Sequence, residues 1–557
     1  MKWRRAFALL AIVGAGVLAY SPALHAGFVF DDHVLIEQGD FLQGPLWRIW
    51  FSGDAPDYWP LTYTSFWLEL RGWGMWAPGY HAVNVVLHVV AAVLLWRVLS
   101  KLGVPGAWLA GLLFAVHPVA VESVAWISER KNTLSAVLFL GTVLAWLRAE
   151  RRRAGGESEL RSLALPLGIY TLALLAKTSV VTLPFVLLGV TLVRRGRLNR
   201  RDVLRTVPFF VLALALGVVT VGFQATHATG GEIMPRTAAV RIGGAAWALL
   251  AYLQKAWAPV HLGFVYPRWP VEPSSPLYWL PLAVVVAGAA LVVRSWKTRA
   301  GPVAWALAFQ AVMLLPVLGL LDMSFLHLAP MSNHFGYLAL MAPAALTGYG
   351  LSLLSAGRLR PLALAGLALV GWLGATTFQR ASAFQDDLTL WALATQEQPA
   401  SLAATIRYGD ELAARGRAPE ALAVLESFAQ RSADEVDRRR ALALWLIDVG
   451  RLDEALGQEL TADSVRPDRG AQLMIAKLFL EAGRPQDAVT LLTPLLTIMP
   501  RSAETRFLLG AALVAQGQRE EARQLLLEGL ALDRGNARLL SALAVMDAPN
   551  GRDAPSP

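Results

Sequence analysis

The sequence predicts an all-α protein in which a polytopic bundle of membrane-spanning helices is followed by an α-solenoid of helical repeats. Two observations predict the bundle. The 557-residue chain is 55% hydrophobic and only 16% charged, and its mean hydropathy of +0.46 exceeds that of ordinary soluble domains. A third observation predicts the solenoid, because glycine and alanine recur with a regular period after the last long apolar run.

The apolar runs predict about eleven membrane spans, since a helix needs about 20 mostly apolar residues to cross the hydrocarbon core. The runs lie near residues 6–24, 80–99, 106–124, 133–147, 162–177, 179–193, 206–223, 277–293, 302–320, 336–354 and 361–377. The stretch 240–258 is also apolar, but a twelfth crossing there would place two later basic groups outside, namely Arg294, Lys297 and Arg299, and then Arg358 and Arg360. We therefore expect 240–258 to form an interfacial or re-entrant helix.

Basic residues between the spans predict the orientation of the bundle. One cluster extends from Arg148 to Arg161 and another from Arg194 to Arg205, and short loops rich in arginine and lysine stay in the cytoplasm. This places the N-terminus inside and everything after residue 378 outside. The stretch before Phe28 also has the features of a cleavable signal peptide, and both alternatives, cleaved or retained, leave Phe28 outside.

The C-terminal part carries an internal repeat. Its glycines are spaced 34, 33 and 34 residues apart, and alanines follow with the same spacing: Gly416, Gly450, Gly483 and Gly517, then Ala421, Ala455, Ala488 and Ala522. This period is the tetratricopeptide signature. The expected organisation is a membrane domain at 1–377, a linking helix at 378–401, about four repeats at 402–548 and a disordered tail at 549–557.

The composition also indicates which classes of partner to expect. The net charge of +9 lies mostly between apolar runs, not in a basic patch with interleaved aromatics, so we expect a lipid bilayer and no nucleic acid as partner. A stack of repeats offers a concave surface for a protein or an extended peptide. The chain has no cysteine, which excludes disulfides, thiolate metal sites and a thiol nucleophile.

The first candidate for chemistry follows the first span directly. Asp31, Asp32 and His33 are ionisable groups at a membrane surface, where such groups indicate function. A carboxylate there could accept the proton of an attacking hydroxyl, as a general base does. The alternative is an ordinary solvated loop.

The second outer turn combines acids, histidine and cations, and its main members are His117, Glu122, Glu129, Arg130 and Lys131. Arg130 and Lys131 lie on the outer side against the local charge bias, which favours a phosphate ligand for them. The alternative is structural pairing with Glu129. Two more cations at outer turns, Lys177 and Arg268, complete a candidate rim for a phosphate leaving group.

A polar group also precedes the tenth span. Asn333 and His334 lie there, with Tyr337 one helical turn further on. No ligand spacing in this region is specific for a metal, so we expect no certain cofactor, although a divalent metal is compatible with the sequence.

Several motifs occur together in the order of one known family. They are Phe28–Asp32, Trp59-Pro60-Leu61-Thr62, Gly79–Asn84 with Leu87-His88, His117-Pro118 with Glu122 and Trp126–Lys131, Ala176-Lys177-Thr178, Thr182-Leu183-Pro184 and Tyr266-Pro267-Arg268-Trp269. In these motifs the chain resembles the bacterial relatives of the transmembrane-and-tetratricopeptide-repeat O-mannosyltransferases. The resemblance covers essentially the whole chain, repeats included.

The resemblance implies a GT-C fold, a polyprenyl-phosphate-linked sugar donor and catalytic acids at Asp31, Asp32 and Glu122. It also implies a multi-pass protein of the bacterial inner membrane with periplasmic repeats. Many relatives have Asp-Arg-Tyr or Asp-His-Trp where this chain has Asn333-His334-Phe335. An acidic role is therefore lost at that position, whereas His334 and Tyr337 keep the frame of the motif.

The resulting hypothesis is an inverting glycosyltransferase. Asp31 or Asp32 deprotonates a hydroxyl of an extracytoplasmic acceptor, such as a protein Ser or Thr, and Arg130, Lys131, Lys177 and Arg268 stabilise the departing lipid phosphate. The repeats present or select the acceptor.

Two other classes of protein stay open at this stage. One is a membrane-anchored scaffold for periplasmic protein assembly, whose repeats do the work. The other is a transporter of lipid-linked sugars, which would carry charged or broken segments in mid-membrane. The eleven spans argue against a mere anchor, and the position of the ionisable residues at outer span ends argues against a transporter.

Overall fold

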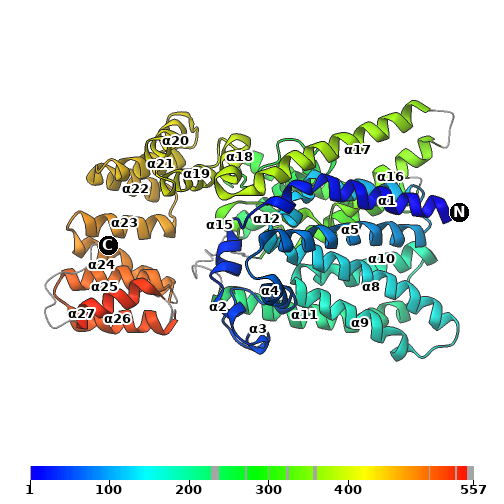
Figure 1. Cartoon of the computed structure of the whole chain (residues 1–557), viewed down its shortest axis with the longest axis horizontal. Coiled ribbons are helices and arrows are strands. Elements are labelled where there is room, and N and C mark those ends of the chain that lie inside the picture. The colour runs from blue at the N-terminus through cyan, green and yellow to red at the C-terminus, as the bar shows by residue number, and fades with distance from the viewer. Residues whose placement is uncertain are drawn as a thin grey trace. The chain divides into compact units, whose positions relative to one another are not determined.

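The computed structural model describes residues 2–227, 237–269, 273–298, 300–321, 325–355, 360–500, 502–532 and 536–547. Every regular element in these ranges is helical, as Figure 1 shows. The chain divides into two compact units, one of Met1–Gln224 with Pro235–Gln398 and the other chiefly of Pro399–Pro557. The expected tail 549–557 lies outside the described residues. Each unit is considered by itself.

The first unit begins with one long helix, a loop region of short helices, and then a series of long helices. Its elements up to residue 227 are α1 (Lys2–Ala19), η1 (Ser21–His25), η2 (His33–Glu37), α2 (Asp40–Gln43), α3 (Leu46–Phe51), α4 (Pro60–Trp73), α5 (Ala77–Lys101), α6 (Ala107–Ala115), η3 (Pro118–Ala120), α7 (Val121–Ala125), η4 (Ile127–Glu129), α8 (Arg130–Ala154), α9 (Glu159–Ala176), η5 (Thr178–Thr182), α10 (Leu183–Arg195) and α11 (Arg200–His227).

The remaining elements of this unit are α12 (Ala238–Trp257), η6 (Pro276–Trp279), α13 (Leu280–Ser295), α14 (Gly301–Leu314), η7 (Leu315–Val317), α15 (Phe325–Leu328), η8 (Asn333–Gly336), α16 (Met341–Ser355), α17 (Arg360–Ala381), η9 (Ser382–Gln385) and α18 (Asp387–Glu397). The helix α18 lies within the stretch 378–401, where a linking helix was expected, and it belongs to this first unit.

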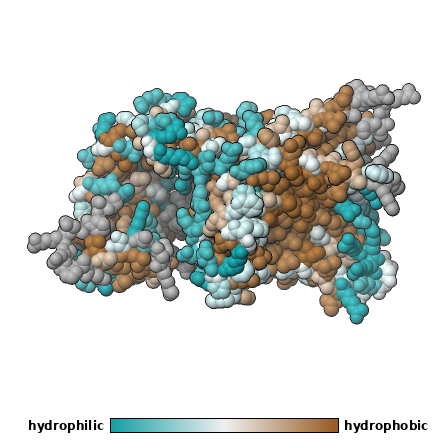
Figure 2. Space-filling model, in the orientation of Figure 1, coloured by the Kyte–Doolittle hydropathy of each residue, from teal (hydrophilic) through white to brown (hydrophobic). Residues whose placement is uncertain are grey.

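Six described helices are long and apolar enough to cross a membrane, namely Ala77–Lys101, Ile127–Arg153, Glu159–Ala176, Thr178–Arg195, Arg200–Gln224 and Pro276–Ser295. Hydrophobic side chains gather over this bundle in Figure 2, with hydrophilic residues at both ends of the apolar area. The helix α12, expected to be interfacial or re-entrant, is not among the six found in the described ranges.

The other expected spans take different forms. The span predicted at 106–124 is a pair of helices, Ala107–Ala115 and Pro118–Ala125, bent by 51°. The break falls at His117, which is extended (φ −81°, ψ 123°) because the following proline disfavours the helical conformation of the residue before it. Shorter apolar helices stand at Arg5–Ala19, Gly301–Val317 and Met341–Leu354. The number of membrane crossings therefore stays a prediction.

An ion network joins the ends of α8, α9, α10 and α11 where the basic loops lie. Glu150, with a side chain only 7% exposed, pairs with both Arg195 and Arg205. Arg195 also contacts Asp202 at 2.6 Å, and Arg205 reaches Glu159. Part of the basic charge that predicts orientation thus also fastens four helices to one another.

The loop region between α1 and α5 has a small core of its own. Buried side chains from η2, α2, α3, the segment after α3, α4, the start of α5 and η4 form it, and they are Leu35, Ile36, Phe41, Leu42, Ile49, Ala55, Tyr63, Phe66, Ala77, Tyr80 and Ile127. Trp50, Trp59 and Trp67 pack on this core. This folded loop therefore gives the residues that follow α1 fixed positions.

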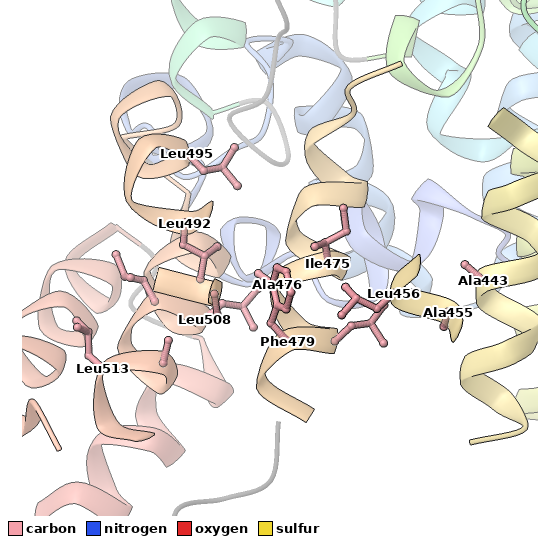
Figure 3. Packing of buried hydrophobic residues seen from close by; sticks show 14 of the residues in the cluster. Ala443, Ala455, Leu456, Ile475, Ala476, Phe479, Leu492, Leu495, Leu508 and Leu513 are labelled. Atoms are coloured by element: carbon pink, nitrogen blue, oxygen red, sulfur yellow. The ribbon is translucent and has the colours of Figure 1, made fainter. Parts of the chain in front are cut away.

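The second unit consists of antiparallel helix pairs. They are α19 (Leu402–Ala414) with α20 (Ala418–Arg431), α21 (Glu435–Asp448) with α22 (Leu452–Val465), α23 (Arg469–Glu481) with α24 (Pro485–Ile498), and α25 (Ala503–Ala515) with α26 (Arg519–Leu532), followed by α27 (Ala537–Asp547). Buried residues of successive pairs point toward one another, as Figure 3 shows for Phe479, Leu492 and Leu508.

The repeated glycines and alanines have the roles that their spacing predicts. Gly483 has φ +69°, and the N–H of the next residue, Arg484, donates to the carbonyl of Phe479 at 2.7 Å. This is a Schellman ending, which favours glycine because the left-handed conformation carries no Cβ penalty there. Ala488 is fully buried, so the second helix of the pair can lie close to the first.

Candidate functional site

The two adjacent acids after α1 have different environments. Asp32 is fully buried, and its carboxylate accepts the N–H of Val29 at 3.1 Å and the N–H of Ser128 at 2.7 Å. Asp31 is only partly buried. Burial raises the pKa of Asp32 to about 7, against the effect of the two backbone hydrogen bonds. Asp32 thus ties the loop after α1 to the segment before α8, and Asp31 is the acid with solvent access.

The backbone next to these acids is held in an unusual conformation. Phe30 has φ +51°, a region that non-glycine residues seldom occupy and that is often found at functional sites. Its ring packs against those of Trp126 and Trp391 at centroid distances of 5.6 and 5.3 Å. Its N–H donates to Asp387 at 2.8 Å. Packing and hydrogen bonding from distant parts of the sequence therefore stabilise the turn that presents Asp31.

His33 lies between two carboxylates. Its Nδ1 is 2.5 Å from Glu37 Oε2 and its Nε2 is 2.6 Å from Asp387 Oδ2. His33 sits in η2, a single-turn π-helix, an element frequently found at functional sites. Asp387 therefore holds both Phe30 and His33, and α18 positions the acidic loop.

Glu122 is buried and accepts several hydrogen bonds from one short loop. Asn333 Nδ2 donates to its Oε1 at 2.6 Å, while the hydroxyl of Ser332 and the N–H of His334 donate to its Oε2 at 2.8 and 3.0 Å. Asn333 Oδ1 in turn accepts from the hydroxyl of Tyr266 at 2.8 Å. Glu122 thus organises the loop that carries Asn333, His334 and Phe335.

Arg130 and Lys131 are neighbours with different partners. The guanidinium of Arg130 is fully buried and pairs with Glu69. It also donates to Asn84 Oδ1 at 2.6 Å and to the carbonyl of Tyr80 at 2.7 Å. A buried guanidinium with this set of partners holds α4, α5 and α8 together, because unpairing it would be costly.

Lys131 and Lys177 share the carboxylate of Glu129. Lys131 Nζ lies 2.6 Å from Glu129 Oε1, and Lys177 Nζ lies 3.5 Å from Oε2. Lys177 also donates to Asn132 Oδ1 at 2.6 Å. His334 Nε2 is 3.8 Å from Glu129 Oε1. Each ammonium has three donors, so these two lysines are the cations of this cluster that could bind a phosphate.

Asp57 was not among the residues that the sequence motifs pointed to, yet it lies in the same neighbourhood. It accepts a hydrogen bond from Gln224 Nε2 at 3.3 Å. Burial raises the pKa of Asp57 to about 6, the charges of Lys131 and Lys177 act against this shift, and Asp31 adds to it. The structure therefore brings a second carboxylate to the two lysines and Asp31. Its position two residues before the Trp59-Pro60 motif was the available signal.

The other predicted site residues lie in less central places. His117 is buried, with Nε2 at 3.2 Å from the carbonyl of Ala256. The Tyr337 hydroxyl is 2.7 Å from His88 Nδ1, also in a buried environment. Arg268 is exposed on the segment after α12. No cluster of three or more His, Cys, Asp or Glu side chains suited to a metal was found within the described ranges.

Fold and site together define a class: an all-α protein with membrane-type helices, a polar site at their ends and a tetratricopeptide solenoid. The tetratricopeptide repeat family matches residues 479–546. The protein O-mannosyl-transferase Tmtc1 of Drosophila melanogaster is 35% identical over 192 residues, covering 31% of this chain and 22% of the fly protein. Tmtc2 of the same species is 33% identical over 193 residues, covering 32% and 20%. The chain is therefore a relative of the TMTC protein O-mannosyl-transferases.

These matches cover only about a fifth of each fly protein. Among solved structures, the tetratricopeptide protein YrrB matches with a TM-score of 0.23 at 16% identity, covering 31% of this chain and 88% of that structure. A TM-score this low carries no argument about function.

Proposed function

We propose that this chain is a membrane glycosyltransferase that moves a sugar from a polyprenyl-phosphate donor to a hydroxyl of an extracytoplasmic acceptor, with protein Ser or Thr as the preferred class. The observation that carries the proposal is that Lys131 and Lys177 share the carboxylate of Glu129. The charges of both lysines and of Asp31 also act on Asp57. Glycosyl transfer with inversion needs a base for the acceptor and cations for the leaving phosphate on opposite sides of the sugar.

In this mechanism the carboxylate of Asp31 accepts the proton of the acceptor hydroxyl. The hydroxyl oxygen bonds to the anomeric carbon as the bond from that carbon to the phosphate oxygen breaks. The electron pair leaves with the lipid phosphate, which Lys131 and Lys177 bind. The products are the glycosylated acceptor and the free polyprenyl phosphate.

Other residues position these groups. Asp32 holds the acid loop through its two backbone hydrogen bonds, Arg130 holds three helices through Glu69, Asn84 and Tyr80, and Glu122 shapes the 332–334 loop. We assign Asp57 to the acceptor side, as a second acid beside Asp31. Arg268 is assigned to the headgroup of the donor, and the repeats are assigned to binding a protein acceptor. The orientation follows the basic loops, with the repeats in the periplasm of a bacterial inner membrane.

The test measures release of free polyprenyl phosphate by the purified full-length chain, with a panel of polyprenyl-phosphate sugars and a periplasmic extract as acceptor. We expect Asp31→Asn to lower kcat by about 100-fold or more, the usual contribution of a general base. Asp57→Asn is expected to lower turnover less, and Lys131→Ala or Lys177→Ala to slow turnover through the leaving group.

Asp40→Asn is the matched control, because Asp40 is an exposed acid of the same loop region. Equal turnover by Asp31→Asn and Asp40→Asn would refute the role of Asp31. If the wild type turned over no donor but bound one periplasmic protein tightly, the scaffold function would replace the proposed one.

A further inference from the structure

A second site is suggested by a cavity that no step of the proposed reaction uses. The cavity has a volume of about 600 Å³ and lies among α5, α8, α10, α14 and α16. Val98, Phe139, Val190, Phe309 and Leu346 represent its aliphatic and aromatic wall. This volume is in the range of protein sites that enclose a small organic ligand.

Polar side chains on the wall lie mainly at one end. The residues at that end come from 102–105, 296–298 and 301–302, and include Lys297 and Thr298. Among the described residues that line the cavity, Lys297 alone has a charged side chain. Its Nζ lies 4.8 Å from the centroid of the Trp296 ring. A tryptophan beside a lysine at a helix end is typical of a membrane–water interface.

The cavity is separate from the lysine and carboxylate site. On α8, Phe139 follows Asn132 by seven residues, which is about 10 Å along the helix axis. Ala136, Leu183 and Met313 lie between the two levels on α8, α10 and α14, and all three are buried. None of Asp31, Asp57, Lys131 and Lys177 lines the cavity. The residues proposed to bind the donor phosphate and the acceptor therefore take no part in this cavity.

We infer that the cavity binds an anionic phospholipid of the leaflet that faces the basic loops, with an acyl chain between the helices and the phosphate at Lys297. An apolar wall with one cation at its interfacial end complements an amphiphile with a negative head. Burial of the acyl chain supplies the affinity through the hydrophobic effect, and Lys297 supplies the preference for negative charge. The lipid would also fill a void between five helices.

A larger side chain at Gly189 would fill part of the cavity. A Cβ at Gly189 would lie 3.5 Å from Trp305 Cζ3, an ordinary contact, so Gly189→Leu places apolar atoms in the space of the acyl chain. Gly168 on α9 is exposed and has open space at its Cβ position, which makes Gly168→Leu the matched control. For the headgroup, Lys297→Ala is compared with Arg148→Ala, because Arg148 is exposed on α8 and does not line the cavity.

The experiment measures lipid retained by the purified full-length chain, using native mass spectrometry with phosphatidylglycerol or phosphatidylcholine. A phosphatidylglycerol with a diazirine at the end of an acyl chain locates the site by cross-linking. We expect cross-links on α8 and α10 at the cavity wall, a loss of retention of about tenfold in Gly189→Leu, and loss of the preference for phosphatidylglycerol in Lys297→Ala. Both control variants should behave as the wild type does.

Three results would overturn the inference. The first is equal retention by Gly189→Leu and Gly168→Leu. The second is cross-linking of the wild type away from the cavity wall, which needs no variant and so does not depend on how the variants fold. The third is protection of the cavity by polyprenyl phosphate but not by phosphatidylglycerol, which would assign it to the donor.

Discussion

Asp31 and Asp32 are adjacent in sequence, but the loop core turns one inward and leaves the other half-exposed. The inward carboxylate accepts backbone N–H groups from two loops, which a base that must release its proton to solvent would not need. We therefore treat Asp32 as a positioning residue. Its protonation should change the stability of the folded chain and not act directly in the reaction.

The stability of the folded chain is expected to fall as the pH rises from about 4 to about 7. Burial raises the pKa of Asp32 to about 7, so the folded state binds this proton more tightly than the unfolded state, and the contribution is lost as the pH rises. Asp32→Asn should reduce this slope and leave the part that comes from Asp57, whose pKa burial also raises. It should lower stability by about 1–3 kcal/mol, because its amide nitrogen cannot accept a backbone N–H.

Thermal unfolding followed by tryptophan fluorescence between pH 4 and 8 measures this effect. The control Asp40→Asn should keep the slope of the wild type. A slope that is the same in Asp32→Asn and in the wild type would mean that another group titrates in this window.

Sequence motifs indicate which residues gather at the site more readily than they indicate what each one does. The sequence does not distinguish Arg130 from Lys131, because both are cations at adjacent positions. Only the fold shows that Arg130 pairs with Glu69, which lies 61 positions away. Asp57 has no motif of its own, so its position beside two lysines depends on how the loop core folds. Side-chain direction within a loop is set by tertiary packing, which local sequence does not encode.

Helical elements are easier to predict, and their breaks are harder. The apolar runs and the 34-residue period predict the all-α fold with a membrane-type bundle and a repeat solenoid, which the structure and the family matches confirm. The bend between Ala115 and Pro118 was missed, although the His117-Pro118 step was its visible signal. A hydropathy average does not detect the break at His117-Pro118, because the segments before and after it are both apolar.

Two glycine substitutions in the repeats should have opposite effects on stability. Gly483 is in the left-handed region with φ +69°, so Gly483→Ala should destabilise the α23–α24 pair by about 1–2 kcal/mol. Gly457 is exposed inside α22, so Gly457→Ala should stabilise that helix by about 0.5–1 kcal/mol.

Hydrogen exchange of the amides in α22, α23 and α24, measured on the full-length chain, separates the two effects. Faster exchange in Gly483→Ala and slower exchange in Gly457→Ala are the expected results. Equal changes of the same sign would show that the glycine turns do not control the stability of the pairs.

At the scale of the whole molecule, orientation is the main prediction. The apolar area over the first unit in Figure 2 and the six membrane-type helices support insertion in a bilayer, and the basic loops predict which side each loop faces. The chain has no cysteine, so single cysteines can report sidedness without background.

We expect Ser464→Cys, on the exposed surface of α22, to react with a membrane-impermeant maleimide in intact spheroplasts. Ser158→Cys, in the basic loop before α9, should react only after permeabilisation. Both serines are exposed on the protein surface, so a difference in labelling would report the side of the membrane and not the burial of the residue. Labelling of Ser158→Cys in intact spheroplasts would reverse the orientation.

The pair of Glu69 and Arg130 has a consequence for how the chain is made. Its two members are separated by 61 positions, and at about 5–20 residues per second the ribosome needs roughly 3–12 s to pass from one to the other. During that interval Glu69 has no partner at its final site, so the loop region between α1 and α5 cannot complete its structure until the start of α8 emerges. A nascent chain arrested before residue 130 should therefore expose this loop to protease, and the same chain arrested well beyond it should protect the loop.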